Sequence, residues 1–219
     1  MPEWSTVHFW RQRYRDMFPA VRKLPILPSP EAWLAACIES RAGLDRTQIT
    51  VLDVGAGNRD MLMKLEPVRQ YISYKSQDID RVWPHDFYDT KEITTQFDFV
   101  VCCEVVEHIP AAGKVPFFDE LHRLTKPDGW VVLTTPNVHH PIAYWLDFTH
   151  LNPVHYYDLA GLLGRSGFTD IAIFRLTRMN PKKRLTAFIF RPLLKLLHMD
   201  YAQSILAVAR RPAEAGDRE

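Results

Sequence analysis

Histidine residues gather late in the chain, in the stretch VHHPIAYWLDFTHLNPVHYYD. A neutral imidazole can accept a proton from a hydroxyl group near neutral pH, and histidine is the most common general base in enzymes. The four rings belong to His139, His140, His150 and His155. Each ring alone has an ordinary structural explanation, but four in one short segment predict a loop with a functional role.

A second group of ionisable side chains lies in the phrase EVVEH. Glu104, Glu107 and His108 are spaced so that one turn of helix would aim all three at one point. Two carboxylates and an imidazole can bind Mg²⁺ or a transition metal ion. The sequence therefore leaves a divalent metal site open here without favouring it, and His108 is also a candidate catalytic residue.

The stretch VLDVGAGN, residues 51–58, ends an apolar run in small residues. Gly55 and Gly57 have no Cβ atom, so the chain can turn tightly and a ligand can approach the backbone. The dinucleotide fingerprint G-x-G-x-x-G fails, because its third glycine is replaced by Asp60. An aspartate at the start of a helix repels the phosphate that would bind there. The pattern predicts a nucleoside ligand without phosphates.

Three further carboxylates fit such a nucleoside. Asp78 ends the second predicted strand, where a carboxylate can accept hydrogen bonds from both hydroxyl groups of a ribose. Asp86, in PHDFYD, lies where a third strand would end and can accept from the exocyclic amine of adenine. Asp53 suits a cationic sulfonium or ammonium group. Together these residues predict a pocket for S-adenosylmethionine.

The elements that must position these residues alternate from residue 49 onwards. Apolar or β-branched runs predict strands in ITVLDV, YISYKSQDID, FDFVVCCEVV, WVVLTTPN, TDIAIFRLTR and QSILAVARRP. Helical spacing predicts helices in RDMLMKLEPVRQ, in KVPFFDELHRLT, which the KPDG turn closes, and in DLAGLLGRSGF. Strands that alternate with helices predict an α/β fold with a doubly wound, mainly parallel, seven-stranded sheet.

Two segments stand outside this alternation. Residues 1–48 are predicted to form an N-terminal helical cap on a cofactor-binding domain of residues 49–219. An amphipathic helical insertion, broken at Pro192, is predicted at about 181–200. It is either a lid over the site or a contact with a membrane surface or a lipid-linked substrate. Its apolar side chains are Leu185, Phe188, Ile189, Leu193, Leu196 and Leu197, and its cations are Lys182, Lys183, Arg184, Arg191 and Lys195.

Composition limits the classes of function. The chain of 219 residues has a formal net charge of +1, which gives no global field that favours nucleic acid. No apolar run is long enough to span a bilayer. Two of the three cysteines, Cys102 and Cys103, are adjacent, so a disulfide framework is not expected. We expect a cytoplasmic protein, with peripheral contact at the inner membrane surface as the alternative.

Four motifs follow one another in the order of one enzyme family. VLDVGAGN, SQDID, FDFVVCCEVVEHI and LHRLTKPDGWVVLTTPN resemble successive motifs of the class I, Rossmann-like S-adenosylmethionine-dependent methyltransferases. The resemblance covers about residues 49–175 in unbroken order, with PDG in place of PGG and little room for a helix between Asp80 and Phe97. The phrase LDFTHLNPVHYYDLAGLLGRSGF resembles a segment of sugar and polysaccharide methyltransferases. EVVEH also resembles the metal-binding motif of quinone-biosynthetic and small-RNA 2′-O-methyltransferases.

The resemblance implies roles for individual residues. His150 becomes the preferred general base, because the loop after WVVLTTPN is where the substrate-facing lid belongs. His155 and His108 are the other catalytic candidates, although His155 also precedes a helix expected near Asp158 and could cap it. The implied cofactor-binding residues are Asp53, Gly55, Ala56 and Gly57 on the methionine side, Asp78 with Ile79 at the ribose, Asp86 and Phe87 at the adenine, and Cys103 after the fourth strand.

The leading hypothesis is an enzyme that transfers a methyl group from S-adenosylmethionine to a hydroxyl of a sugar, glycan or small metabolite. S-adenosylhomocysteine would be the second product. One alternative is a metal-assisted 2′-O- or catechol-type methyltransferase that uses Glu104, Glu107 and His108. Another is a non-catalytic protein that only binds the cofactor. An RNA acceptor is disfavoured by the nearly neutral charge, and the sequence predicts no oligomeric state.

Overall fold

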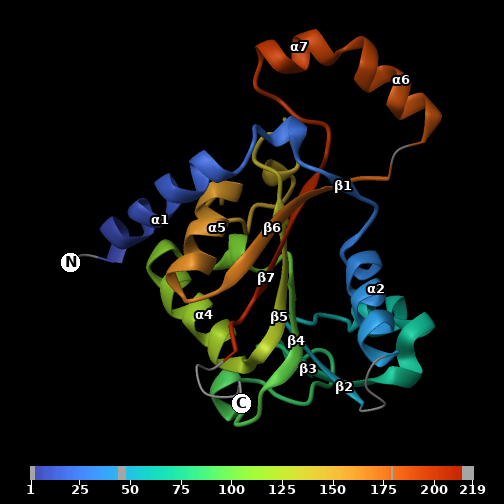
Figure 1. Cartoon of the computed structure of the whole chain (residues 1–219), viewed down its shortest axis with the longest axis vertical. Coiled ribbons are helices and arrows are strands. Elements are labelled where there is room, and N and C mark those ends of the chain that lie inside the picture. The colour runs from blue at the N-terminus through green and yellow to red at the C-terminus, as the bar shows by residue number, and fades with distance from the viewer. Residues whose placement is uncertain (1–2, 44–47, 179, 214–219) are drawn as a thin grey trace.

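The computed structural model of the chain describes residues 3–43, 48–178 and 180–213. Figure 1 shows a central sheet with helices on both faces and a helical arch, α6 and α7, standing clear of one end. The strands are β1 (Ile26–Leu27), β2 (Ile49–Val54), β3 (Ile72–Gln77), β4 (Phe97–Cys103), β5 (Thr125–Pro136), β6 (Thr169–Leu176) and β7 (Ser204–Arg210). The helices are α1 (Glu3–Met17), α2 (Pro30–Ala42), α3 (Asp60–Lys64), α4 (Ala111–Leu124), α5 (Tyr156–Arg165), α6 (Pro181–Ile189) and α7 (Arg191–Leu196). Short 3-10 turns are η1 (Val21–Lys23), η2 (Glu66–Tyr71), η3 (Thr90–Glu92), η4 (Val106–His108) and η5 (Tyr144–Leu146).

The seven strands are ordered β1-β6-β7-β5-β4-β2-β3. Neighbouring strands are parallel, except that β7 runs antiparallel to both β5 and β6. The doubly wound, mainly parallel, seven-stranded sheet is thus confirmed. Parallel strands bring their C-terminal ends to one edge of the sheet, so the turns after β2, β3, β4 and β5 meet there. All the predicted site residues lie in or beside those turns.

The seventh strand is not where we expected it. The stretch around Asp86 contributes only an isolated bridge between Phe87 and Gln77. The strand that completes the sheet is β1, which pairs in parallel with β6 at the opposite edge. Prolines crowd this segment and the strand has two residues, so no alternating pattern marks it in the sequence. The N-terminal segment, predicted as a cap, therefore also contributes to the sheet.

Helices cover both faces of the sheet. In Figure 1, α1, α4 and α5 lie on one side, and α2 lies on the other. Helix α1 is fixed against α5 by an ion pair between Arg11 and Asp158 at 3.0 Å. The hydroxyl of Tyr156 donates to the carbonyl of Pro19 at 3.0 Å just beyond the helix. The N-terminal segment is thereby attached to the side of the sheet that carries the histidine-rich loop.

Local departures from the expected elements have simple causes. The predicted helix RDMLMKLEPVRQ is divided into α3 and η2 because Pro67 lacks the amide hydrogen that a continuing helix needs. The KPDG segment is part of β5, where Asp128 adopts a φ of 62°, a conformation that glycine reaches at less cost. Between Asp80 and Phe97 only η3 forms, as the short spacing predicted. In the described residues no helix is both long enough and apolar enough to cross a membrane.

Candidate active site

The two glycines in the turn after β2 have different surroundings. Gly55 and Gly57 have φ values of 71° and 49°. A Cβ atom on Gly55 would collide with the side chain of Val105, whereas one on Gly57 would meet no described atom within 4 Å. The amides of Gly55 and Ala56 both donate to the carbonyl of Gln77, at 2.8 and 3.1 Å. Packing therefore requires Gly55, while Gly57 faces open space that a ligand can fill.

Asp78 lies at the mouth of this turn. Its Oδ2 accepts a hydrogen bond of 2.8 Å from the amide of Gly57, which holds the carboxylate in place. The neighbouring Ile79 is 85% exposed, and Trp83 is exposed as well. Apolar surface beside a fixed carboxylate suits an aromatic base and a ribose. These contacts fit a nucleoside at the position that the sequence predicted.

Asp86 is already engaged inside the protein. It accepts hydrogen bonds from the Lys75 ammonium at 2.8 Å and from the Ser76 amide at 2.9 Å. Burial opposes ionisation, but these donors hold the pKa of Asp86 below its usual value. The amide of Phe87 donates to the Ser76 carbonyl at 3.1 Å. Asp86 thus fastens its segment to β3, which weakens its predicted role at adenine. The half-buried side chain of Phe87 packs against the apolar core.

Asp53 is turned into the sheet. Asp53 is only 3% exposed, and its carboxylate accepts a hydrogen bond of 2.5 Å from the hydroxyl of Tyr74 on β3. Burial raises the pKa of Asp53 to about 6, in spite of that hydrogen bond. The Arg59 guanidinium lies 5.7 Å from the centre of the Tyr74 ring. Asp53 is therefore held inside the sheet by Tyr74. Sequence reasoning missed Tyr74 as its partner and Arg59 as the cation over the Tyr74 ring.

A hollow of about 650 Å³ opens at the same edge of the sheet. This volume is in the usual range of small-molecule sites. Cys103, predicted to contact the cofactor, lines it; burial raises the pKa of its thiol to about 12, so the group stays neutral. The other lining residues that matter here are Met61 and Lys64 of α3, Glu104 after β4, Thr134 of β5 and Pro28 to Glu31 of the N-terminal segment.

The prediction that Glu104, Glu107 and His108 share one helical turn is wrong. Glu104 adopts a φ of 53°, and only Val106–His108 form the short turn η4. The two carboxyl groups are nevertheless neighbours. The surrounding protein and then the charge of Glu107 raise the pKa of Glu104 to about 7. Burial also raises the pKa of Glu107, so the two neighbouring carboxyl groups oppose each other's ionisation.

Glu107, His108 and His150 form a compact centre. One nitrogen or oxygen atom from each lies within 4.8 Å of the others. The amide of Leu151 donates to the Glu107 carbonyl at 2.9 Å, which brings the loop after β5 onto η4. His150 Nε2 lies 4.0 Å from Glu107 Oε1, a buried oxygen without a hydrogen-bond partner in the described part of the chain. The centre thus combines a buried carboxylate with two imidazoles.

Hydrogen bonds to the other ring nitrogens fix the tautomers of these imidazoles. His150 Nδ1 lies 2.6 Å from the carbonyl of Tyr144, which can only accept. His108 Nδ1 lies 3.0 Å from the hydroxyl of Thr149, which gives its own hydrogen to Asp147 at 2.7 Å. In the neutral rings both protons are therefore on Nδ1 and both lone pairs on Nε2. Each Nε2 can accept a proton or bind a metal ion.

His155 has a different environment from His150. Its Nδ1 accepts from the amide of Tyr157 at 3.1 Å and so caps α5, which begins at Tyr156. Its Nε2 lies 2.9 Å from Nε2 of His139, whose Nδ1 contacts the carbonyl of His198 at 2.9 Å. Burial lowers the pKa of His155 to about 4. Both ring nitrogens are used within the protein, which favours the capping role over the catalytic one.

Comparison with known proteins agrees with this arrangement. Residues 9–173 match a family model described as a methyltransferase domain, and the chain belongs to that family. No match was found among curated proteins. A S-adenosylmethionine-dependent methyltransferase from Archaeoglobus fulgidus is similar, with a TM-score of 0.61 and 17% identity over 82% of this chain and 94% of that one.

Two further solved structures share the fold. Phosphoethanolamine N-methyltransferase 2 from Haemonchus contortus, in complex with S-adenosyl-L-methionine, has a TM-score of 0.53 and 16% identity over 82% of this chain and 52% of that one. Magnesium protoporphyrin IX methyltransferase from Synechocystis, with the same cofactor bound, has a TM-score of 0.52 and 16% identity over 83% and 77%. The chain is therefore a member of a methyltransferase family and shares the fold of solved S-adenosylmethionine-dependent methyltransferases.

Proposed function

We propose that this enzyme methylates a hydroxyl group on a small molecule or glycan and that His150 is the general base. The observation that carries the proposal is the fixed tautomer of His150, whose Nδ1 is held by the Tyr144 carbonyl at 2.6 Å. Its basic Nε2 faces the buried carboxylate of Glu107 at 4.0 Å. A base of this kind needs a lone pair of fixed direction and a nearby anion that stabilises the imidazolium once it forms.

The residues have separate tasks in this reaction. S-adenosylmethionine supplies the methyl group on a positively charged sulfur. His150 removes the hydroxyl proton at Nε2, and Glu107 stabilises the resulting imidazolium. His108, oriented by Thr149 and Asp147, lines the approach and excludes water. Since methyl transfer is an in-line displacement, most of the rate enhancement comes from alignment of the two reactants.

The cofactor is proposed to occupy the space in front of Gly57, with its ribose on Asp78 and its base against Ile79 and Phe87. Support comes from the open space at Gly57, the exposed apolar side chain of Ile79 and the orientation of Asp78. Cys103 lines the adjoining hollow, and residues 1–48 act as a cap there through Pro28 to Glu31. Asp53, Gly55 and Ala56 shape the turn beneath.

The chemistry is tested by the product formed from isotopically labelled S-adenosylmethionine. The enzyme is incubated with small-molecule and glycan acceptors that carry a hydroxyl, an amine or an acidic carbon, since N- and carbon methyltransferases are among its structural neighbours. We expect label in a methyl ether. Label in an N-methyl or C-methyl product alone would contradict the proposed hydroxyl acceptor.

Metal-assisted methylation is the second candidate, with a changed set of ligands. Glu107, His108 and His150 replace the predicted Glu104, Glu107 and His108, and the unpartnered Oε1 of Glu107 could bind a divalent ion. The same assay in excess EDTA separates the two mechanisms. Undiminished turnover is expected for the histidine base. Loss of turnover that returns with one added metal ion would establish the metal mechanism instead.

A further inference from the structure

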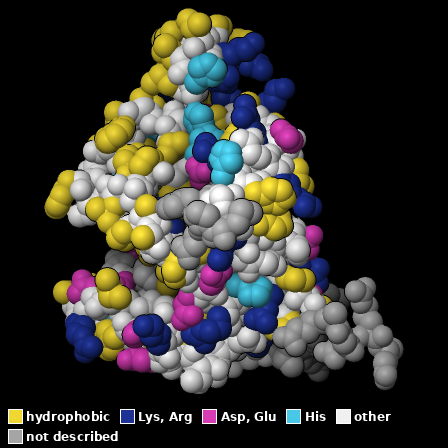
Figure 2. All heavy atoms as spheres, turned by 90° about the vertical axis from the view of Figure 1, so that its left-hand side faces the viewer, with side chains coloured by type: hydrophobic (Ala, Val, Ile, Leu, Met, Phe, Trp, Pro, Cys, Tyr) yellow, Lys and Arg dark blue, Asp and Glu magenta, His cyan; other side chains and the backbone are white. Residues whose placement is uncertain are grey.

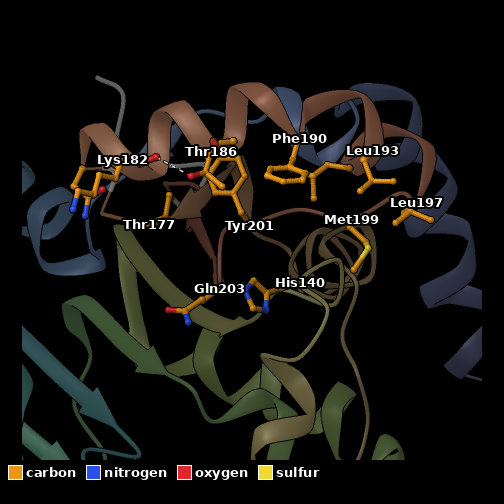
Figure 3. Close-up of a pocket in the computed structure, with 13 residues that line it drawn as sticks. His140, Thr177, Lys182, Thr186, Phe190, Leu193, Leu197, Met199, Tyr201 and Gln203 are labelled. Carbon is orange, nitrogen blue, oxygen red and sulfur yellow. Dashed lines mark hydrogen bonds between the residues drawn. The ribbon is translucent and has the colours of Figure 1, made fainter.

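A second cavity, of about 670 Å³, lies beneath α6 and α7. Figure 3 shows its apolar roof, to which α7 contributes Leu193 and the residues that flank α7 contribute Phe190 and Leu197. The floor is more polar and includes His140 and Gln203. The cavity therefore suits a molecule with an apolar part under the helices and a polar part towards the sheet.

This cavity adjoins the hollow lined by Cys103 and Glu104, because Thr177 and Gln203 line both spaces. His140 Nδ1 accepts from the amide of Ala143 at 3.0 Å, so the neutral ring carries its proton on Nε2. Burial lowers the pKa of His140, which favours this neutral form. Its Nε2 hydrogen can be donated to an oxygen of the acceptor.

The arch of α6 and α7 also presents apolar side chains to solvent. Leu185, Phe188, Ile189 and Leu196 are 61, 73, 60 and 75% exposed. The arch contacts the N-terminal segment, because Arg22 Nη1 donates to the carbonyl of Leu194 at 2.8 Å. A helical segment with several exposed large hydrophobic side chains is typical of an interaction surface.

The charge of this segment is entirely basic. Residues 177–199 contain six lysines and arginines and no aspartate or glutamate, although the chain as a whole has a net charge of only +1. Lys182, Arg191 and Lys195 are exposed, and the nearest following acid, Asp200, is buried and paired with Arg175 at 3.0 Å. The side chains of Lys183 and Arg184 lie outside the described part of the structure. Figure 2 shows hydrophobic and basic side chains together at the upper end of the molecule.

We propose that the arch, α6 and α7, docks on an anionic lipid bilayer and that the cavity beneath it receives an amphiphilic acceptor from that surface. The acceptor class rests on the proposed function, whereas the docking does not. Apolar side chains that insert at the headgroup level and cations that contact anionic lipids together give stable, reversible binding. The orientation follows from the structure, since the cavity lies directly under the docking helices.

The test is binding of the full-length protein to vesicles, measured by co-sedimentation. Vesicles of phosphatidylcholine with phosphatidylglycerol should bind it, pure phosphatidylcholine much less, and high salt should weaken binding. Phe188→Ser should weaken binding by about tenfold, since a buried aromatic side chain is lost from the contact. Phe9→Ser is the matched control, because Phe9 is also exposed, at 62%, but lies on α1.

A charge variant makes the test independent of apolar packing. Arg191→Glu with Lys195→Glu should weaken binding at least about tenfold, whereas Arg13→Glu with Arg15→Glu on α1 should not.

No binding of wild type to anionic vesicles, or equal binding by the arch and control variants, would overturn the docking. Concentration-dependent dimerisation abolished by Phe188→Ser would also overturn it, by assigning the arch to a second copy. Calorimetry with S-adenosylhomocysteine on the same samples keeps this result separate from the proposed function, since cofactor binding without vesicle binding rejects the docking alone.

Discussion

His150→Ala is expected to keep the affinity for S-adenosylmethionine and to lose about 10²–10⁴-fold in turnover. The reason is that His150 Nε2 is the proposed proton acceptor, while the cofactor is proposed to bind at the turns after β2 and β3. Initial rates with the acceptor found by the labelling assay, and calorimetry with the cofactor, measure the two quantities separately.

A conservative variant separates base catalysis from packing. Glutamine at position 150 can still donate to the Tyr144 carbonyl, but it cannot accept and hold a proton near neutral pH. His150→Gln should therefore be nearly as inactive as His150→Ala. His8→Ala, on the exposed side of α1, is a control that should change neither rate nor affinity. Near-normal turnover in His150→Gln would exclude His150 as the base.

The second large effect is expected when alanine replaces either Gly57 or Gly55. Gly57→Ala should cost about 1–2 kcal/mol of stability, because alanine disfavours a positive φ, and should weaken cofactor binding at least about tenfold. The added methyl group would enter the open space in front of the turn. Gly55→Ala should be the more destabilising change, since its methyl group collides with Val105. Thermal unfolding and calorimetry on both variants provide the comparison.

A double variant checks the reason for the Gly55 effect. Gly55→Ala combined with Val105→Ala removes the methyl groups that collide, so it should recover part of the stability lost in Gly55→Ala. The same Val105→Ala change should give no recovery of cofactor binding to Gly57→Ala. Wild-type cofactor affinity in Gly57→Ala would show that the space in front of the turn is not where the cofactor binds.

The sheet and the glycine turn after β2 could be predicted because their signals are local. Strand periodicity is written in consecutive residues, and Gly55 and Gly57 stand next to the strand that they end. The role of His155 as the N-cap of a helix could also be predicted, since the residue directly precedes α5. Thr149 could have been noticed as well, because it stands beside His150 in the phrase FTHLNP and its hydroxyl contacts His108.

The features that sequence reasoning missed depend on the sign of a backbone φ angle or on contacts between residues far apart in the sequence. Nothing in EVVEH shows that Glu104 adopts a positive φ, which takes it out of a common turn with Glu107. His150 reaches Glu107 only because the Leu151 amide binds the Glu107 carbonyl, across 44 positions of sequence. The engagement of Asp86 by Lys75 likewise depends on how a loop folds back on an edge strand. Such contacts have no periodic pattern from which to predict them.

In the proposed reaction, the donor methyl group faces the centre formed by Glu107, His108 and His150. A crystal structure with S-adenosylhomocysteine bound tests it most directly, because the sulfur marks the position from which the methyl group leaves. We predict the ribose hydroxyls on Asp78, the base against Ile79 and the sulfur on the side of the turn that faces His150, with room between them for one acceptor oxygen. A sulfur directed away from this centre, with another ionisable side chain nearer to it, would contradict the account.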